Sequence, residues 1–84
     1  MIRFAHIRYK TKEGNIAPHG GITYAYELDD NNKVIGYAKA KCHERDMFCK
    51  QQGRVKALGL MKSPRYFKEV NMDKNIFFDM INVM

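Results

Sequence analysis

A seven-residue stretch that alternates between two kinds of side chain constrains the fold of this chain most strongly. One side of it carries Ile22, Tyr24, Tyr26 and Leu28, and the other carries Thr23, Ala25 and Glu27. This period of two is typical of a β-strand. Turn-forming residues 29–32 follow, and asparagine tolerates a positive φ, so we predict a two-residue type I′ loop at Asn31-Asn32. That loop would pair Asp30 with Lys33 and begin the second strand of a hairpin.

The predicted hairpin has two very different faces. Its register places opposite each other Tyr24 and Lys39, Tyr26 and Tyr37, Leu28 and Ile35, Ala25 and Ala38, and Thr23 and Ala40. One face is then built from small residues, which lets a helix backbone approach closely. The other face is aromatic and apolar, and such a patch seldom stays exposed on a monomer.

A main helix is predicted over residues 44–62, starting at Cys42 or His43 and ending at Ser63-Pro64. Its apolar stripe would sit on the small face and comprise Phe48, Gln51 or Gln52, Val55, Leu58, and Met61 or Lys62. Gly53 and Gly59 interrupt this helix, either for close packing on the sheet or for close approach to a ligand.

The rest of the chain adds a strand at Ile2 to Lys10, a short extended segment from Arg65 to Val70, and a final helix capped by Asn71 or Asp73. The stripe of that helix would be Ile76, Phe77, Met80, Ile81 and Met84. We therefore predict a single α+β domain over residues 1–84. It has a three-stranded antiparallel sheet, one main helix packed on one face and a short C-terminal helix.

The aromatic face and the final helix together suggest a homodimer, because a chain of 84 residues buries a modest core and gains stability from association. The residues expected at the interface between subunits are Tyr24, Tyr26, Tyr37, Phe77 and Ile81. The pattern alone leaves open whether the final helix docks on its own sheet or on the other subunit. It also leaves open whether the tyrosines stack on unpaired bases instead.

The charge of the chain favours a polyanionic partner. Fifteen lysines and arginines against nine acidic residues give a net charge of +6, which suits nucleic acid or an acidic protein surface. The chain starts without the basic-then-apolar order of a signal peptide and has no apolar run of membrane-spanning length. We therefore expect a cytoplasmic protein whose two cysteines, Cys42 and Cys49, are free thiols.

No catalytic constellation stands out in the sequence. Three histidines, His6, His19 and His43, could serve a metal-independent ribonuclease, but their spacing favours surface or capping roles. Cys42 and Cys49 lack the second pair that a zinc cage needs. Phosphate-loop, dinucleotide-binding and metalloprotease motifs do not occur. We therefore expect no enzyme activity, no metal and no cofactor.

The basic residues are the positive functional signal. Lys50 and Arg54 would lie along one edge of the main helix and Arg45 and Lys56 along another, while the adjoining strand adds the expected nucleic-acid contacts Lys39 and Lys41. Phosphate contact is the natural use of such residues, so we predict sequence-tolerant RNA binding. A solvated basic face without a partner explains the same charges.

Three runs of residues carry a family resemblance: G-x-T-x-A at Gly21 to Ala25, G-x-A-x-A-x-C at Gly36 to Cys42, and D-x-F-x-K-x-x-G-R-x-x-A at Asp46 to Ala57. In these runs the chain resembles a class of small phage-encoded proteins that includes inhibitors of ToxN-type endoribonuclease toxins.

The resemblance implies an antitoxin-like counter-defence protein that neutralises a host toxin or defence nuclease, with RNA contributing to the complex. It implies RNA contacts at Lys50, Arg54 and Lys56, with Lys39, Lys41 and Arg45 as secondary contacts, and structural roles for Asp46 and Phe48. The alternative is a direct protein–protein inhibitor that needs no RNA.

Overall fold

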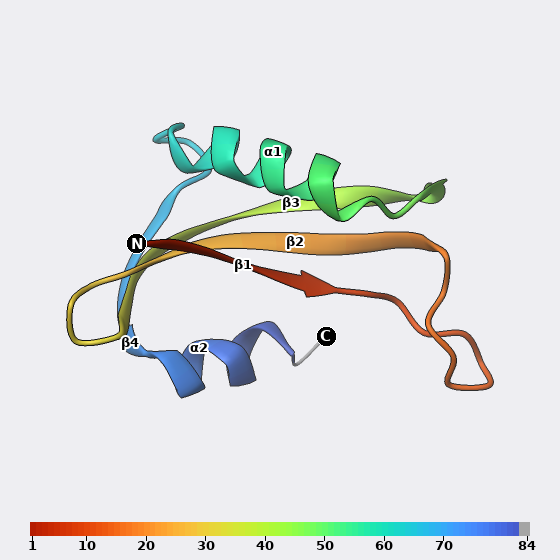
Figure 1. The fold of residues 1–84 in the computed structure, drawn as a ribbon, viewed down its shortest axis with the longest axis horizontal. Helices are drawn as coiled ribbons and strands as arrows, with labels where there is room; N and C mark the ends of the chain where they lie inside the picture. The colour runs from red at the N-terminus through yellow and green to blue at the C-terminus, as the bar shows by residue number, and fades with distance from the viewer. Residues whose placement is uncertain (83–84) are drawn as a thin grey trace.

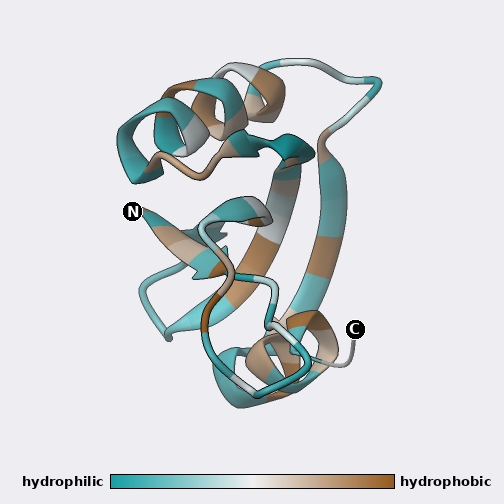
Figure 2. Cartoon of the chain, turned by 90° about the vertical axis from the view of Figure 1, so that its right-hand side faces the viewer, coloured by the Kyte–Doolittle hydropathy of each residue, from teal (hydrophilic) through white to brown (hydrophobic). Residues whose placement is uncertain are grey.

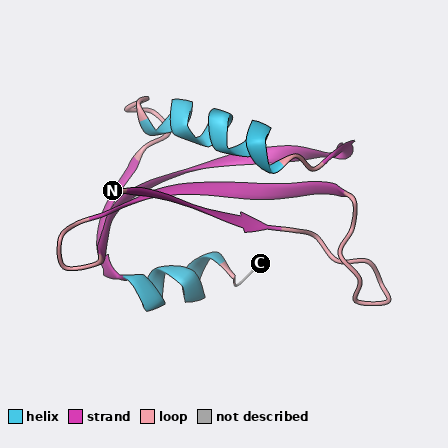
Figure 3. Ribbon diagram, viewed as in Figure 1, coloured by secondary structure: helices cyan, strands magenta, loops and turns pink. Residues whose placement is uncertain are grey.

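The computed structural model describes residues 1–82 and contains four strands and two helices (Figures 1 and 3). In chain order these are β1 (Ile2–Ile7), β2 (His19–Leu28), β3 (Lys33–Met47), α1 (Lys50–Met61), β4 (Lys68–Asp73) and α2 (Lys74–Ile81). The strands form one antiparallel sheet in the order β1-β2-β3-β4. The two helices lie on opposite faces of this sheet (Figure 1). The α+β prediction is confirmed.

The predicted number of strands was wrong, because the sheet has four strands rather than three. The additional strand is β4, which pairs with the start of β3 from Lys33 to Tyr37. The sequence marked residues 65–70 as extended, but only two partly buried apolar residues, Val70 and Met72, alternate in β4. So short a pattern gives no sign of its pairing partner, because the partner lies across the sheet rather than in the neighbouring sequence.

The register of the hairpin is confirmed over its centre, where Tyr24 pairs with Lys39 and Tyr26 with Tyr37. The turn differs from the prediction. Asp29 accepts hydrogen bonds from the amides of Asn31 and Lys33 at 2.9 Å each, and Asn32 alone takes a positive φ, of 61°.

These contacts make a three-residue loop over 30–32, which moves the pairing at the strand end by one residue. Leu28 accordingly pairs with Val34 instead of Ile35. An irregularity between Val34 and Gly36 then restores the predicted register, because Ile35 is an extra residue in β3.

The boundary between β3 and α1 lies further along the chain than the sequence predicted. Strand β3 continues to Met47, and Cys49, not Cys42 or His43, is the N-cap residue of α1. Arg45 therefore belongs to β3 and not to the helix. The carboxylates at 44 and 46, which suggested a first helical turn, lie instead in an irregular part of the strand. Cys42 pairs with Gly21 and Met47 pairs with His19. The four residues 43–46 of β3 therefore lie opposite a single residue of β2, Gly20.

Helix α1 packs on the small-residue face of the sheet, as predicted, but the side of the helix that contacts the sheet is not the predicted one. Ala57 is completely buried against Ala25 and Ala40, whereas Val55 is 67% exposed and Leu58 37% exposed. The predicted stripe through Val55 and Leu58 was therefore wrong. The small face accepts small helix residues, because a side chain there would hold the two backbones apart.

Gly53 shows how closely α1 approaches the sheet, since any Cβ at this position would collide with the side chain of Thr23 on β2. Packing therefore accounts for this glycine. At Gly59 a Cβ would meet nothing within 4 Å, so contact with the sheet does not account for it.

Helix α2 covers the aromatic face of the sheet. The ring centroid of Phe77 lies 5.0 Å from that of Tyr26, 5.4 Å from that of Tyr37 and 6.1 Å from that of Tyr24. Phe77 and Ile81 are almost fully buried. The five residues predicted at a dimer interface thus meet one another within a single chain, and their apolar character needs no second subunit. The homodimer itself stays a prediction.

The start of α2 confirms the predicted cap: the Asp73 carboxylate accepts a hydrogen bond from the amide of Asn75 at 2.8 Å. Of the predicted stripe, Phe77 and Ile81 are buried, Ile76 is 59% exposed, and Met84 lies outside the described residues. Neither helix within residues 1–82 has the length and hydropathy to cross a membrane.

Candidate anion-binding surface

One flank of α1 brings basic side chains from two distant parts of the chain around a single histidine. His6 lies in β1, where it pairs with Thr23. The positive charges of three side chains act on the pKa of His6. These are Lys50 and Arg54, one turn apart on α1, and Arg8, directly after β1. This group of His6, Arg8, Lys50 and Arg54 is called the basic flank below.

Burial and nearby positive charge both disfavour the protonated form of His6. Partial burial lowers the pKa of His6, and the positive charges of Lys50, Arg54 and Arg8 lower it further. Every charged group that shifts this pKa is therefore a cation. A 2.8 Å hydrogen bond between Nδ1 of His6 and Oγ1 of Thr23 fixes the ring on the sheet.

The ring of Phe48 contacts two residues of the basic flank, His6 and Arg8. Its ring packs edge-on against the His6 ring at 5.6 Å, and the guanidinium carbon of Arg8 lies 4.5 Å from its centroid. Arg8 also donates a hydrogen bond to the carbonyl of Ala17 at 3.2 Å. Arg8 is thus held in place by an aromatic face and a carbonyl oxygen, an arrangement that leaves its positive charge uncompensated.

Hydrogen bonding elsewhere neutralises little of this charge. Among residues 1–82, no hydrogen bond joins a lysine or arginine side chain to a carboxylate. The neighbouring start of α1 has no side-chain cap and no acidic residue in its first turn. Its free amides therefore add positive potential beside Lys50.

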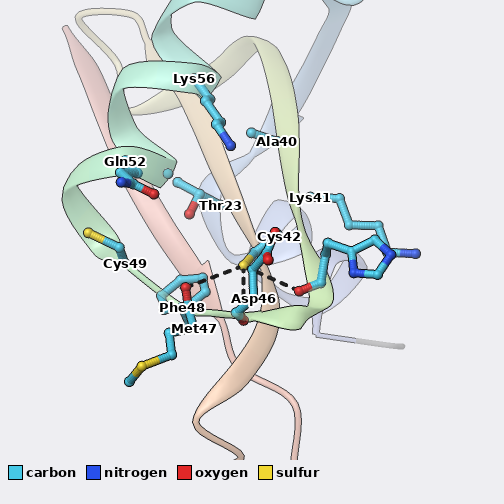
Figure 4. A pocket seen from close by; sticks show the side chains of 12 residues that line it. Thr23, Ala40, Lys41, Cys42, Asp46, Met47, Phe48, Cys49, Gln52 and Lys56 are labelled. Atoms are coloured by element: carbon cyan, nitrogen blue, oxygen red, sulfur yellow. Dashed lines mark hydrogen bonds between the residues drawn. The ribbon is translucent and has the colours of Figure 1, made fainter.

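The other flank of α1 borders a pocket of about 400 Å³ between this helix and the irregular end of β3 (Figure 4). Gln52 and Lys56 reach it from α1, Thr23 from β2, and Cys42 from β3. The thiol of Cys42 is directed at three backbone carbonyl oxygens, those of His43 and Asp46 at 3.6 Å and that of Met47 at 3.7 Å (Figure 4). These contacts hold residues 42–47 in a curl that forms one wall.

The structure divides the predicted nucleic-acid contacts among three places. Lys50 and Arg54 belong to the basic flank, and Lys56 lies across the helix at the pocket. Lys39 and Lys41 are exposed on β3, and Arg45 is exposed within the irregular residues 43–46. Because β4 pairs only as far as Tyr37, Lys39 and Lys41 lie on an unpaired strand edge, where lysine also discourages association between edges.

Sequence reasoning missed His6 and Arg8 as members of the site. Arg8 was only part of the predicted strand from Ile2 to Lys10, and His6 was one of three histidines whose spacing favoured surface or capping roles. The signal that joins them to α1 is the approach at Gly53, which sets the helix directly over Thr23, the partner of His6. Within residues 1–82, no three histidine, cysteine or acidic side chains gather as potential metal ligands.

Figure 2 shows that hydrophilic residues predominate on α1, in keeping with its exposed charges, while α2 carries more hydrophobic ones. No protein-family model, curated protein or solved structure matches this chain.

Proposed function

We propose that this protein binds RNA through the basic flank of α1. The observation that carries the proposal is the grouping of three cations near one histidine. Arg8 stacks on Phe48, whose ring contacts His6, and the charges of Lys50, Arg54 and Arg8 add to burial in lowering the pKa of that histidine. Bringing like charges together from separate elements costs free energy in the isolated protein. A bound phosphodiester backbone would relieve that cost, because its anions lie between the cations.

The mechanism is phosphate contact with release of counterions. Lys50 and Arg54 are exposed and can each meet one phosphate, while Arg8 is held by Phe48 and adds charge without losing further freedom. Contacts to phosphates carry no sequence information, so binding of this kind would tolerate any sequence. Affinity should fall steeply as salt is raised.

The proposed biological role is that of a small phage-encoded counter-defence protein. The run from Asp46 to Ala57, one of the three that carry the resemblance, includes Lys50 and Arg54, the two α1 residues of the basic flank. In this role the protein would act in the cytoplasm of an infected bacterium, as a homodimer, and would use bound RNA to inhibit a ToxN-type endoribonuclease toxin or another defence nuclease. It would itself have no catalytic activity, metal or cofactor.

The test replaces the two helix cations of the basic flank, Lys50→Gln with Arg54→Gln, and measures binding of a single-stranded RNA across a series of salt concentrations. Each lost phosphate contact should lower the slope of log affinity against log salt by about 0.7, the value for single strands. The matched control, Lys33→Gln with Lys68→Gln, removes the same charge from exposed positions on β3 and β4. Equal slopes for the two double variants would refute the basic flank as the RNA site.

A direct protein–protein inhibitor is the second candidate, and the unpaired edge of β3 favours it. Lys39 and Lys41 lie there, and an acidic partner could approach them. Ribonuclease treatment of the purified inhibitor separates the two, with inhibition of the toxin as the readout. An RNA-dependent inhibitor loses activity after digestion, whereas a protein-only inhibitor keeps it.

A further inference from the structure

The pocket on the opposite flank of α1 is formed by backbone features that keep it open. Residues 43–46 face only Gly20 across the sheet, so this part of β3 bulges away from β2. The thiol of Cys42 fills the inside of that bulge, where its one hydrogen can be donated to any of three carbonyl oxygens. The remaining space, about 400 Å³, lies between the bulge and the first turns of α1. This volume is within the range of small-molecule sites.

The lining of the pocket combines an aromatic ring with a few polar groups. Phe48 contributes an aromatic ring, and Gln52 contributes an amide that both donates and accepts hydrogen bonds. Lys56 extends from α1 toward the centre of the pocket, above Thr23 and Cys42 (Figure 4). Such a lining suits a flat, heteroaromatic group that carries hydrogen-bonding atoms on its edge.

The charged side chains around the pocket are few. Lys56 extends into it, Asp46 borders it, and Lys41 borders it with its side chain turned outward (Figure 4). The pocket also lies one helix width from the basic flank, because Gln52 and Lys56 alternate along α1 with Lys50 and Arg54. A polyanion on one flank can therefore reach the other by crossing the helix.

We propose that this pocket holds one unstacked nucleobase of the RNA whose backbone lies on the basic flank. The inference rests on the proposed function and adds a base-binding subsite to it. The base packs beside Phe48, Gln52 contacts its edge and Lys56 donates to a carbonyl oxygen of the base or to the adjoining phosphate. Since a base in a duplex is paired and stacked, the pocket selects single-stranded RNA over duplex RNA.

The first experiment titrates the isotope-labelled protein with uridine, cytidine, adenosine and guanosine 5′-monophosphates and follows backbone amide resonances by NMR. Ribose 5-phosphate is the matched probe that lacks only the base. The proposal expects amide shifts at Thr23, Cys42, Gln52 and Gly53 with at least one nucleotide and not with ribose 5-phosphate. Shifts of equal size with ribose 5-phosphate, or no shifts at these residues with any nucleotide, would overturn it.

Two neighbouring glutamines supply the matched variants. Gln52 lines the pocket, whereas Gln51 is exposed on the same helix and is not among its lining residues. Gln52→Ala should weaken nucleotide binding at least several-fold, and Gln51→Ala should leave it unchanged. Equal effects of the two variants would overturn the assignment of Gln52 to a base.

The same variants are then compared on a single-stranded RNA and on a duplex of equal length, so that failure of the subsite differs from failure of the proposed function. In one outcome, single-stranded and duplex RNA bind equally well, with the expected salt dependence, and bind equally to both glutamine variants. This outcome would refute the nucleobase pocket but not RNA binding by the basic flank. If neither single-stranded nor duplex RNA binds at low salt, both the proposed function and the nucleobase pocket are refuted.

Discussion

The two faces of the sheet carry helices of opposite character. Helix α2 is capped by Asp73 and buries Phe77 among three tyrosines on its side of the sheet. Helix α1 has no side-chain cap, buries only Ala57 and leaves Val55 mostly in solvent. The α2 face therefore has the larger apolar burial, which supplies most of the stability of a small domain.

This difference separates stability from binding. The exposed cations of α1 and the pocket at its edge need a helix close to the sheet but not a large core beneath it. The small-residue face lets the helix lie close to the sheet but buries little apolar area. The aromatic face on the other side of the sheet compensates for this small apolar burial. Substitutions of the buried α2 side chains should then act on folding, and substitutions of the exposed α1 cations should have little effect on it.

The largest effect is expected from Phe77→Ala. Removing a fully buried phenylalanine leaves a cavity among Tyr24, Tyr26 and Tyr37 and should cost about 3–5 kcal/mol of unfolding free energy. Denaturant unfolding followed by circular dichroism measures it, and Phe77→Leu provides a milder variant that keeps the fold measurable. Val55→Ala on α1 is the control and should change stability by less than about 0.5 kcal/mol. A large loss at Val55 would show that α1 carries as much of the core as α2.

The two glycines of α1 should respond in opposite directions to the same substitution. Gly53→Ala places a methyl group against Thr23 and should cost about 1–3 kcal/mol, as overpacking does. Gly59→Ala meets open space and should stabilise the protein by about 0.5–1 kcal/mol, because alanine favours the helix. Thermal unfolding of both variants measures the contrast. Stabilisation by both would mean that α1 stands further from the sheet.

Much of this fold follows from local patterns in the sequence, and its errors have identifiable causes. The alternation from Ile22 to Leu28 predicted the strand and the central register, and Asp73 was one of two predicted caps. The predicted start of α1 was too early because Glu44 and Asp46 are residues that favour a first helical turn. Only the pairing of Met47 with His19 shows that the strand continues past them.

The candidate site was less predictable than the fold. Lys50 and Arg54 were predicted together because their spacing of four fixes them on one helix edge. Their proximity to His6 and Arg8 depends on how α1 lies across the sheet, which tertiary packing decides. The buried side of α1 was also predicted wrongly, since hydrophobicity pointed to Val55 and Leu58 while the close approach to the sheet required Gly53 and Ala57.

The helix caps sharpen the contrast between the two faces at a smaller scale. Asp73→Ala removes the hydrogen bond to the Asn75 amide and should cost about 1 kcal/mol. Cys49→Ser supplies a hydroxyl where α1 has no side-chain cap and should stabilise the protein by up to about 1 kcal/mol. Chemical denaturation of both variants measures the two effects. A loss of stability in Cys49→Ser would show that the start of α1 is already satisfied by other contacts.

The smallest expected effect is a pH dependence from His6. Its pKa in the folded protein lies below the value of 6.5 in the unfolded chain, because burial and the charges of Lys50, Arg54 and Arg8 disfavour the imidazolium. The unfolded chain therefore binds more protons than the folded one once the pH falls below about 7. Stability should fall as the pH drops through 6.5 and then level off below the folded pKa.

Unfolding at a series of pH values from about 7.5 to 5 measures this loss for the wild type and for His6→Gln, which should lose that part of the pH dependence. His19→Gln, exposed at the start of β2, is the control and should keep it. Bound RNA adds a sharper test, because phosphates among the three cations raise the pKa of His6 and should shrink the loss in the wild type only. An unchanged loss in the RNA complex would separate His6 from the phosphate contacts and place the RNA on another part of the surface.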